Sequence, residues 1–166
     1  MFASVPTETS FLLCAAEAAL VDDVVRRMVG NTGLVRTLRG RKMRTVQGVM
    51  DEFGAALQFP RFFGENWPAL DECLNDLDWL LPAGALVLII QDASVVLANE
   101  DQKELHTLTG VLKTAVSTFA EPIALGEAWD RPAVPFYVVL QAEQTDEQIT
   151  AEKWGYAGAK TKAVAI

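Results

Sequence analysis

The feature that most constrains the fold is an uninterrupted apolar run at residues 85–90, near the middle of the chain. Pro82 and Gly84 precede the run and Asp92 follows it, so it has the length of a strand rather than of a helix. A strand with water on one face alternates apolar and polar residues, whereas a strand covered on both faces is apolar throughout. The run therefore predicts an inner strand of a parallel sheet.

Strand patterns and helix patterns alternate along the rest of the chain. Apolar runs at residues 11–14 and 135–140, and the segment 34–38, predict further strands, and a short helix is expected at 146–153. The longer helices are predicted by stripes of apolar residues at helical spacing: Leu20, Val21, Val24, Val25 and Met28; Val46, Val49, Met50, Phe53 and Leu57; Leu105, Leu108, Leu112, Val116 and Phe119. Strands separated by helices imply parallel pairing through right-handed crossovers. The sequence therefore predicts an α/β fold with a small parallel β-sheet flanked by helices.

Several connecting segments carry their own signals. Gly30 is a plausible end for the first helix, and Thr45 a plausible N-cap for the second. Residues 123–134 form a predicted loop in which Trp129 is expected to turn back into the core. Residues 1–9 are expected to be a loose arm, and the chain is expected to fray from Ala157 onward.

Charge is unevenly distributed in a chain whose net charge is −8. This acidity disfavours nucleic acid and anionic membranes as partners. Residues 24–50 nevertheless contain seven basic residues and no acid, whereas residues 59–79 contain five acids and one base. An RNA-associated protein that uses the basic run 26–44 is therefore one alternative, although no aromatic residue lies among those charges to stack on a base.

The acidic part of the chain begins as an aromatic loop and continues as a helix. Asn66 is a suitable N-cap, and Pro68 falls in the first turn, where a missing N–H costs little. Gly64 is free to adopt a positive φ between bulky neighbours. The predicted inward face consists of Trp67, Leu70, Cys73, Leu74 and Leu77, and the outward face of Pro68, Glu72, Asn75 and Asp76 with Asp71 on its flank.

This segment resembles the signature of the barstar family, small intracellular inhibitors of secreted ribonucleases. The shared pattern is an aromatic pair, then Gly-Glu-Asn, then an acidic helix with Cys-Leu near its middle. Here the pattern reads Phe62-Phe63-Gly64-Glu65-Asn66-Trp67, then Ala69-Leu70, then Cys73-Leu74. The resemblance extends more weakly over residues 34–141. It implies a parallel sheet with helices packed around it. Residues 1–33 and 142–166 have no counterpart in this resemblance. From the strand and helix pattern alone, we expect residues 1–33 to be an extension that adds one βα unit to an edge of the sheet, and residues 142–166 to be a C-terminal tail.

The resemblance implies an intracellular inhibitor that plugs the basic active site of a ribonuclease with its acidic helix and aromatic loop. The carboxylates would stand in for RNA phosphates and pair with basic groups of the enzyme. The implied partner-binding residues are Phe62, Phe63, Gly64, Glu65, Asn66, Pro68, Asp71, Glu72, Asn75 and Asp76. A barstar-like module for a partner other than a ribonuclease is the second alternative.

The chain also departs from the family pattern. Glu72 matches the central acid of the barstar helix, with Glu in place of Asp, and Phe62 matches an aromatic contact without its hydroxyl group. Pro68 replaces an acidic contact, and Asp71 takes the place of an aromatic. In a looser part of the alignment, Ser117 occupies a position where an acid is expected.

Nothing in the sequence favours catalysis, a metal or a cofactor. The lone histidine, His106, falls on the polar side of its helix, and no phosphate-binding or dinucleotide-binding motif is present. Cys14 and Cys73 fit no metal spacing, and we expect buried free thiols. The start of the chain lacks the basic and apolar segments of a secretory signal, and no apolar run has the length of a membrane span. We therefore expect a cytoplasmic protein that does not bind membranes.

Overall fold

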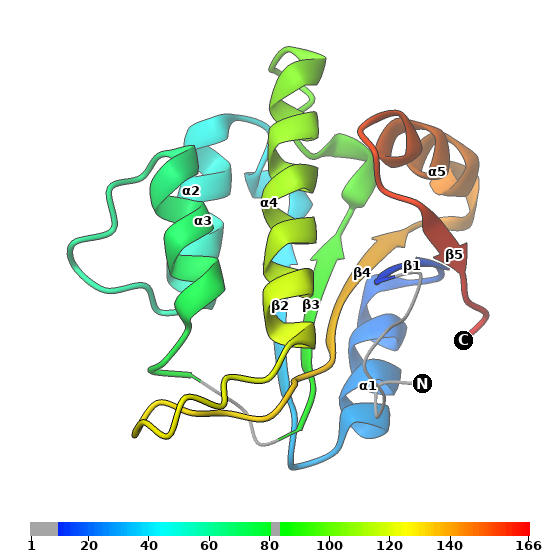
Figure 1. Cartoon of the computed structure of the whole chain (residues 1–166). Helices are drawn as coiled ribbons and strands as arrows, with labels where there is room; N and C mark the ends of the chain where they lie inside the picture. The colour runs from blue at the N-terminus through cyan, green and yellow to red at the C-terminus, as the bar shows by residue number, and fades with distance from the viewer. Residues whose placement is uncertain (1–9, 81–83) are drawn as a thin grey trace.

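The computed structural model describes residues 10–80 and 84–166, which form one five-stranded parallel sheet and five α-helices (Figure 1). The strands are β1 (Phe11–Ala15), β2 (Leu34–Arg39), β3 (Leu86–Gln91), β4 (Phe136–Ala142) and β5 (Thr161–Ala163). The α-helices are α1 (Ala18–Val29), α2 (Val46–Ala56), α3 (Trp67–Asp76), α4 (Gln102–Ala120) and α5 (Glu147–Tyr156), and short 3-10 helices are η1 (Gly40–Lys42), η2 (Ala93–Val95) and η3 (Gln144–Asp146). The predicted α/β fold is confirmed.

The apolar run becomes β3, the second strand in the sheet order β2-β3-β4-β1-β5. Its residues alternate between two separate hydrophobic cores, with Leu86, Leu88 and Ile90 in one and Val87 and Ile89 in the other. All five side chains are fully buried. A strand covered on both faces therefore explains why this run contains no polar residue.

The two faces of the sheet are covered unequally. Helices α2, α3, α4 and α5 pack over one face, and α1 lies over the other (Figure 1). Within α1, Val21 and Val25 are buried, but Leu20 and Met28 are about half exposed. The buried stripe of α1 is therefore narrower than predicted, because no second helix of the described residues lies on that face to cover its flanks.

Both ends of the chain extend the sheet beyond β4. The predicted N-terminal βα unit is present, but β1 is not the edge strand, because it pairs with β4 on one side and with β5 on the other. The expectation that the chain frays from Ala157 onward is wrong. Ala157 and Ala159 are buried, and Thr161 in β5 lies opposite Phe11 in β1. The predicted loose arm at residues 1–9 lies outside the described residues.

The prediction that Trp129 turns into the core is also wrong. Its side chain is 58% exposed. In the same segment, the guanidinium group of Arg131 stacks over the buried ring of Phe119, 4.5 Å from the ring centroid.

The described residues contain two buried free thiols, as predicted. Burial raises the pKa of the Cys14 thiol to about 11 and also raises that of Cys73, to which the charges of Glu72 and Asp76 add. In the same part of the chain, no group of three or more potential metal ligands gathers, and no helix is long and apolar enough to cross a membrane.

Candidate partner-binding surface

Helix α3 has a defined start at Asn66 and a defined end at Leu77. The Asn66 side chain accepts a hydrogen bond from the backbone N–H of Ala69 at 2.9 Å, and Pro68 lies in the first turn, as predicted. Leu77 ends the helix in the left-handed conformation, with φ of 50°, and its N–H donates to the carbonyl oxygen of Cys73. The result is a short helix with fixed ends.

The apolar face of α3 is anchored in the core. Leu70, Leu74 and Leu77 are fully buried, and Cys73 is nearly so. Trp67 is half-buried, and its indole Nε1 donates to Glu104 Oε2 of α4 at 2.8 Å. This bond joins the first turns of two helices that run side by side in the same direction (Figure 1). The buried leucines and the bond to α4 therefore hold α3 firmly in place, and with it the side chains on its outward face.

The aromatic loop before α3 splits its two rings between core and solvent. Phe63 is half-buried against the core, edge-on to Phe59 with 4.8 Å between the ring centroids. Phe62 is 81% exposed, so it is the ring of this pair that a partner could reach. Trp79 also contacts this part of the chain: its Nε1 donates to the carbonyl oxygen of Leu57 at 2.9 Å, and its ring lies edge-on to Phe59.

The backbone of the loop differs from the prediction. Gly64 does not adopt a positive φ; the left-handed residue is its neighbour Glu65, with φ of 50°. Gly64 instead permits close packing, because a Cβ there would lie 3.3 Å from the amide nitrogen of Asn66. That nitrogen donates to the Gly64 carbonyl oxygen at 3.2 Å. Left-handed non-glycine residues are uncommon and concentrate at binding sites, where the surrounding structure holds them.

The outward face of α3 carries carboxylates that lie side by side. Glu72 and Asp76 are exposed, and Asp71 is half-buried. The Asn75 amide donates to the backbone and side-chain oxygens of Asp71, at 2.7 and 3.2 Å. Asn75 is therefore engaged within the helix and orients Asp71.

One acid that belongs to this group was not among the predicted site residues. Asp78 follows the left-handed Leu77, which turns the chain so that Asp78 lies beside Asp76. Partial burial raises the pKa of Asp76, and the hydrogen bond and charge of Asp78, together with the charge of Glu72, raise it further. The spacing of the acids signalled a cluster, but the turn at Leu77 was needed to bring Asp78 into it.

These carboxylates carry uncompensated charge. Across residues 10–80 and 84–166, no Lys or Arg forms an ion pair with any acid of residues 59–79. We call the group the acidic surface; it consists of Glu65, Asp71, Glu72, Asp76 and Asp78. Together with the exposed ring of Phe62, it combines negative charge with a rigid aromatic side chain, as protein-binding surfaces for basic partners do.

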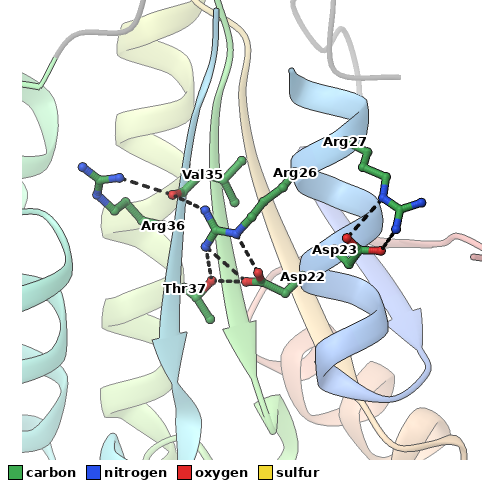
Figure 2. Close-up of polar contacts among 7 residues, drawn as sticks. All are labelled: Asp22, Asp23, Arg26, Arg27, Val35, Arg36 and Thr37. Carbon is green, nitrogen blue, oxygen red and sulfur yellow. Dashed lines mark hydrogen bonds and ion pairs between the residues drawn. The ribbon is translucent and has the colours of Figure 1, made fainter. Parts of the chain in front are cut away.

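The basic run has the opposite character, because acids outside the run form ion pairs with four of its seven basic residues. Arg26 pairs with Asp22 at 2.6 Å and also donates to Thr37 of β2, and Arg27 pairs with Asp23 (Figure 2). Farther along the run, two more ion pairs form: Arg39 with Glu52 and Arg41 with Asp92. The structure thus ties these arginines to the protein itself, which disfavours the RNA-binding alternative.

Comparisons with solved structures find similar folds at low identity. An ORC2 protein from Aeropyrum pernix aligns with a TM-score of 0.61 and 11% identity over 95% of this chain. Cdc6p from Pyrobaculum aerophilum aligns with a TM-score of 0.52 and 12% identity over 98%. This chain spans 41% and 40% of those two chains, and identities this low show a shared fold alone. No curated protein matches the chain.

A family model gives the specific match. The model for barstar, described as the barnase inhibitor, matches residues 34–141. The matched region contains β2, β3, α2, α3 and α4, and with them the aromatic loop and the acidic surface. This match confirms the resemblance that the segment from Phe62 to Leu74 indicated, and the chain therefore belongs to the barstar family.

Proposed function

We propose that this protein inhibits a ribonuclease by placing the acidic surface in the enzyme's active site. A ribonuclease cleft is basic because it must hold phosphates. Carboxylates on a rigid helix reproduce that negative charge and form charge-assisted hydrogen bonds with arginine and lysine. The observation that carries the proposal is the row of carboxylates on α3, none of which is paired with a described basic residue.

In this proposal Glu72 makes the central contact. It is exposed at the middle of α3, with Asp76 one turn later on the same face. Asp71, oriented by Asn75, lies on the flank. Phe62 supplies an apolar contact next to the charges, and its ring has little rotamer freedom to lose on binding. Long-range attraction between the acidic surface and a basic enzyme also speeds their encounter.

The proposal assigns the chain no catalysis and places its action in the cytoplasm. His106 is exposed on α4, and a buried thiol with a raised pKa, such as Cys73, is a poor nucleophile. Inhibition would follow from binding alone, with one inhibitor for each enzyme molecule.

The departures from the family pattern bear on which ribonuclease is bound. Pro68 and Ser117 are exposed at positions where the resemblance implies acids. A missing carboxylate leaves a basic group of the enzyme buried and unpaired, which weakens binding. We therefore expect barnase to be bound weakly, and a ribonuclease with differently placed basic groups to be bound tightly.

The test is a titration of the purified chain into ribonucleases that cleave a fluorogenic oligoribonucleotide. The set contains barnase and small basic ribonucleases, including any small basic protein encoded next to this chain. We expect complete inhibition of at least one enzyme at a 1:1 ratio. Failure to inhibit any of them would contradict the proposal. Direct binding of the oligoribonucleotide to this chain without enzyme would also contradict it, because the loss of cleavage would then come from sequestration of RNA. A basic protein that binds tightly and keeps its ribonuclease activity would favour the alternative of a barstar-like module with another partner.

A further inference from the structure

The long connection between α4 and β4, residues 121–135, is an ordered structure in its own right. Most loops of this length that lack secondary structure are either functional or disordered. Here Ile123 and Arg131 form an antiparallel bridge, with N···O distances of 2.8 and 3.0 Å. Between them, the Asp130 carboxylate accepts hydrogen bonds from the backbone N–H groups of Leu125 and Gly126, at 2.9 and 2.8 Å. The tip of the loop is thereby fixed.

Arg131 fastens this loop to the end of α4. Its guanidinium group donates to the carbonyl oxygens of Thr118 and Glu121, at 3.0 and 3.1 Å, and stacks on the ring of Phe119. Phe119 is fully buried, and its carbonyl oxygen accepts from Val134 N–H at 2.7 Å. Arg131 is half-buried and is the one basic residue of the loop, which also carries Glu121, Glu127 and Asp130, so the net charge of the loop is negative.

The side chains that this fixed loop displays are apolar and acidic. Leu125 is 74% exposed and Trp129 is 58% exposed. The acids Glu121, Glu127 and Asp130 are exposed around them. A rigid loop that holds a large aromatic residue in solvent loses little entropy on binding, and tryptophan is among the residues that dominate binding energy at protein interfaces.

The loop lies at one end of the acidic surface. Helices α3 and α4 run in the same direction, with Trp67 and Glu104 joining their first turns, so their last turns also lie at a common end of the molecule. Figure 1 shows the loop, in yellow, beneath the lower ends of both helices. Asp76 and Asp78 are at that end of α3. Negative charge thus continues from α3 onto the loop.

We propose that the loop 121–134 is a second contact surface for the same basic ribonuclease, with Trp129 and Leu125 as its apolar anchors. This inference rests on the proposed function. The partner follows from charge complementarity and from continuity with the acidic surface, because one basic protein can cover both. The loop would contact the rim of the enzyme's cleft while α3 enters the cleft.

The test uses the enzyme that the wild-type chain inhibits in the titration above. Association and dissociation rates are measured for the variants Trp129→Ser, Leu125→Ser and Glu72→Gln. The matched control is Tyr156→Ser, which removes an aromatic side chain that is 74% exposed from α5, on the far side of α4 (Figure 1). We expect Trp129→Ser to weaken binding about tenfold or more, chiefly through faster dissociation, with a smaller loss for Leu125→Ser. Tyr156→Ser should leave both rates unchanged.

The outcomes separate the two proposals. The role of the loop would be overturned if Trp129→Ser and Leu125→Ser bound as tightly as wild type while Glu72→Gln bound weakly. That result would leave the proposed role of the acidic surface intact. Unchanged binding in all three variants would overturn both. A wild-type chain that binds none of the ribonucleases would overturn the proposed function and this inference with it. Thermal melts establish that each variant is folded. We expect Trp129→Ser and Leu125→Ser to be folded because both side chains are exposed and lie outside the core.

Discussion

Replacing Glu72 by Gln should separate binding from stability. Glu72 is exposed, lies outside the buried face of α3 and has no ion-pair partner among the described residues. Its charge adds to the crowding that raises the pKa of Asp76 one turn away. Like charges at this helical spacing destabilise by about 0.2–0.5 kcal/mol. The Glu72→Gln variant should therefore unfold at the same temperature as wild type or slightly higher.

Binding should change in the opposite direction and by much more. Truncating one partner of a buried, hydrogen-bonded charge pair costs about 2–5 kcal/mol. This corresponds to about 30-fold to several-thousand-fold weaker binding. Isothermal titration calorimetry with the inhibited ribonuclease measures the affinity, and differential scanning calorimetry measures the stability of the free variant.

The control for Glu72 is Glu147→Gln, which removes the same charge from an exposed position on α5, on the far side of α4 (Figure 1). Glu147→Gln should bind like wild type, apart from a small loss of long-range attraction. A Glu72→Gln variant that binds as tightly as this control would refute the central role of Glu72. A Glu72→Gln variant that is clearly less stable than wild type would refute the view that its carboxylate is uncompensated in the free protein.

Three further predictions concern charge and burial. Asp76→Asn should stabilise the free protein at neutral pH yet weaken binding. Burial and the Asp78 carboxylate raise the pKa of Asp76, so the charged Asp76 side chain destabilises the folded protein at neutral pH, and this destabilisation disappears in acid. The melting temperatures of wild type and variant should therefore converge as pH falls through the raised pKa of Asp76. Glu52→Gln should cost about 1–3 kcal/mol at neutral pH. Burial alone would raise the pKa of Glu52, but the hydrogen bonds and charge of Arg39 outweigh burial and lower that pKa. The stability from this ion pair is therefore fully present above the ordinary pKa of a glutamate, and it is lost as pH falls through the lowered pKa of Glu52. A difference in melting temperature between wild type and Glu52→Gln that did not shrink in acid would contradict the ion pair as its source. Cys73→Ala should lower stability and leave inhibition intact, because the thiol is buried against the core; loss of inhibition in a folded variant would point to a role in binding.

The parts of the fold that the sequence predicted are those with local causes. Asn66 caps α3 through a residue three positions away, and the apolar run of β3 reflects burial on both faces. β5 was missed because its three residues, Thr161–Ala163, show no apolar pattern and their partner strand lies at the other end of the chain. The exposure of Trp129 could not be predicted, because the sequence of a loop does not show whether an aromatic side chain in it packs inward or outward.

The candidate surface shows the same division. The spacing of acids on α3 placed Glu72 and Asp76 outward, as the structure has them. The left-handed turn at Leu77, which brings Asp78 to Asp76, is set by how the chain leaves the helix rather than by any residue preference. Likewise, the pairing of Arg41 with Asp92 joins residues 51 positions apart, so the charge of the basic run could not be assessed from its own segment.

The central claim is that the acidic surface occupies the site where the ribonuclease holds RNA phosphates. Competition with a nucleoside 3′-monophosphate tests this most directly, because such a ligand fills that site without unfolding either protein. The affinity of this chain for the inhibited ribonuclease is measured by calorimetry at increasing nucleotide concentrations. The account predicts that the apparent Kd rises linearly with the nucleotide concentration, as direct competition for one site requires. An apparent Kd that stays constant when the enzyme is saturated with nucleotide would show that the acidic surface binds elsewhere.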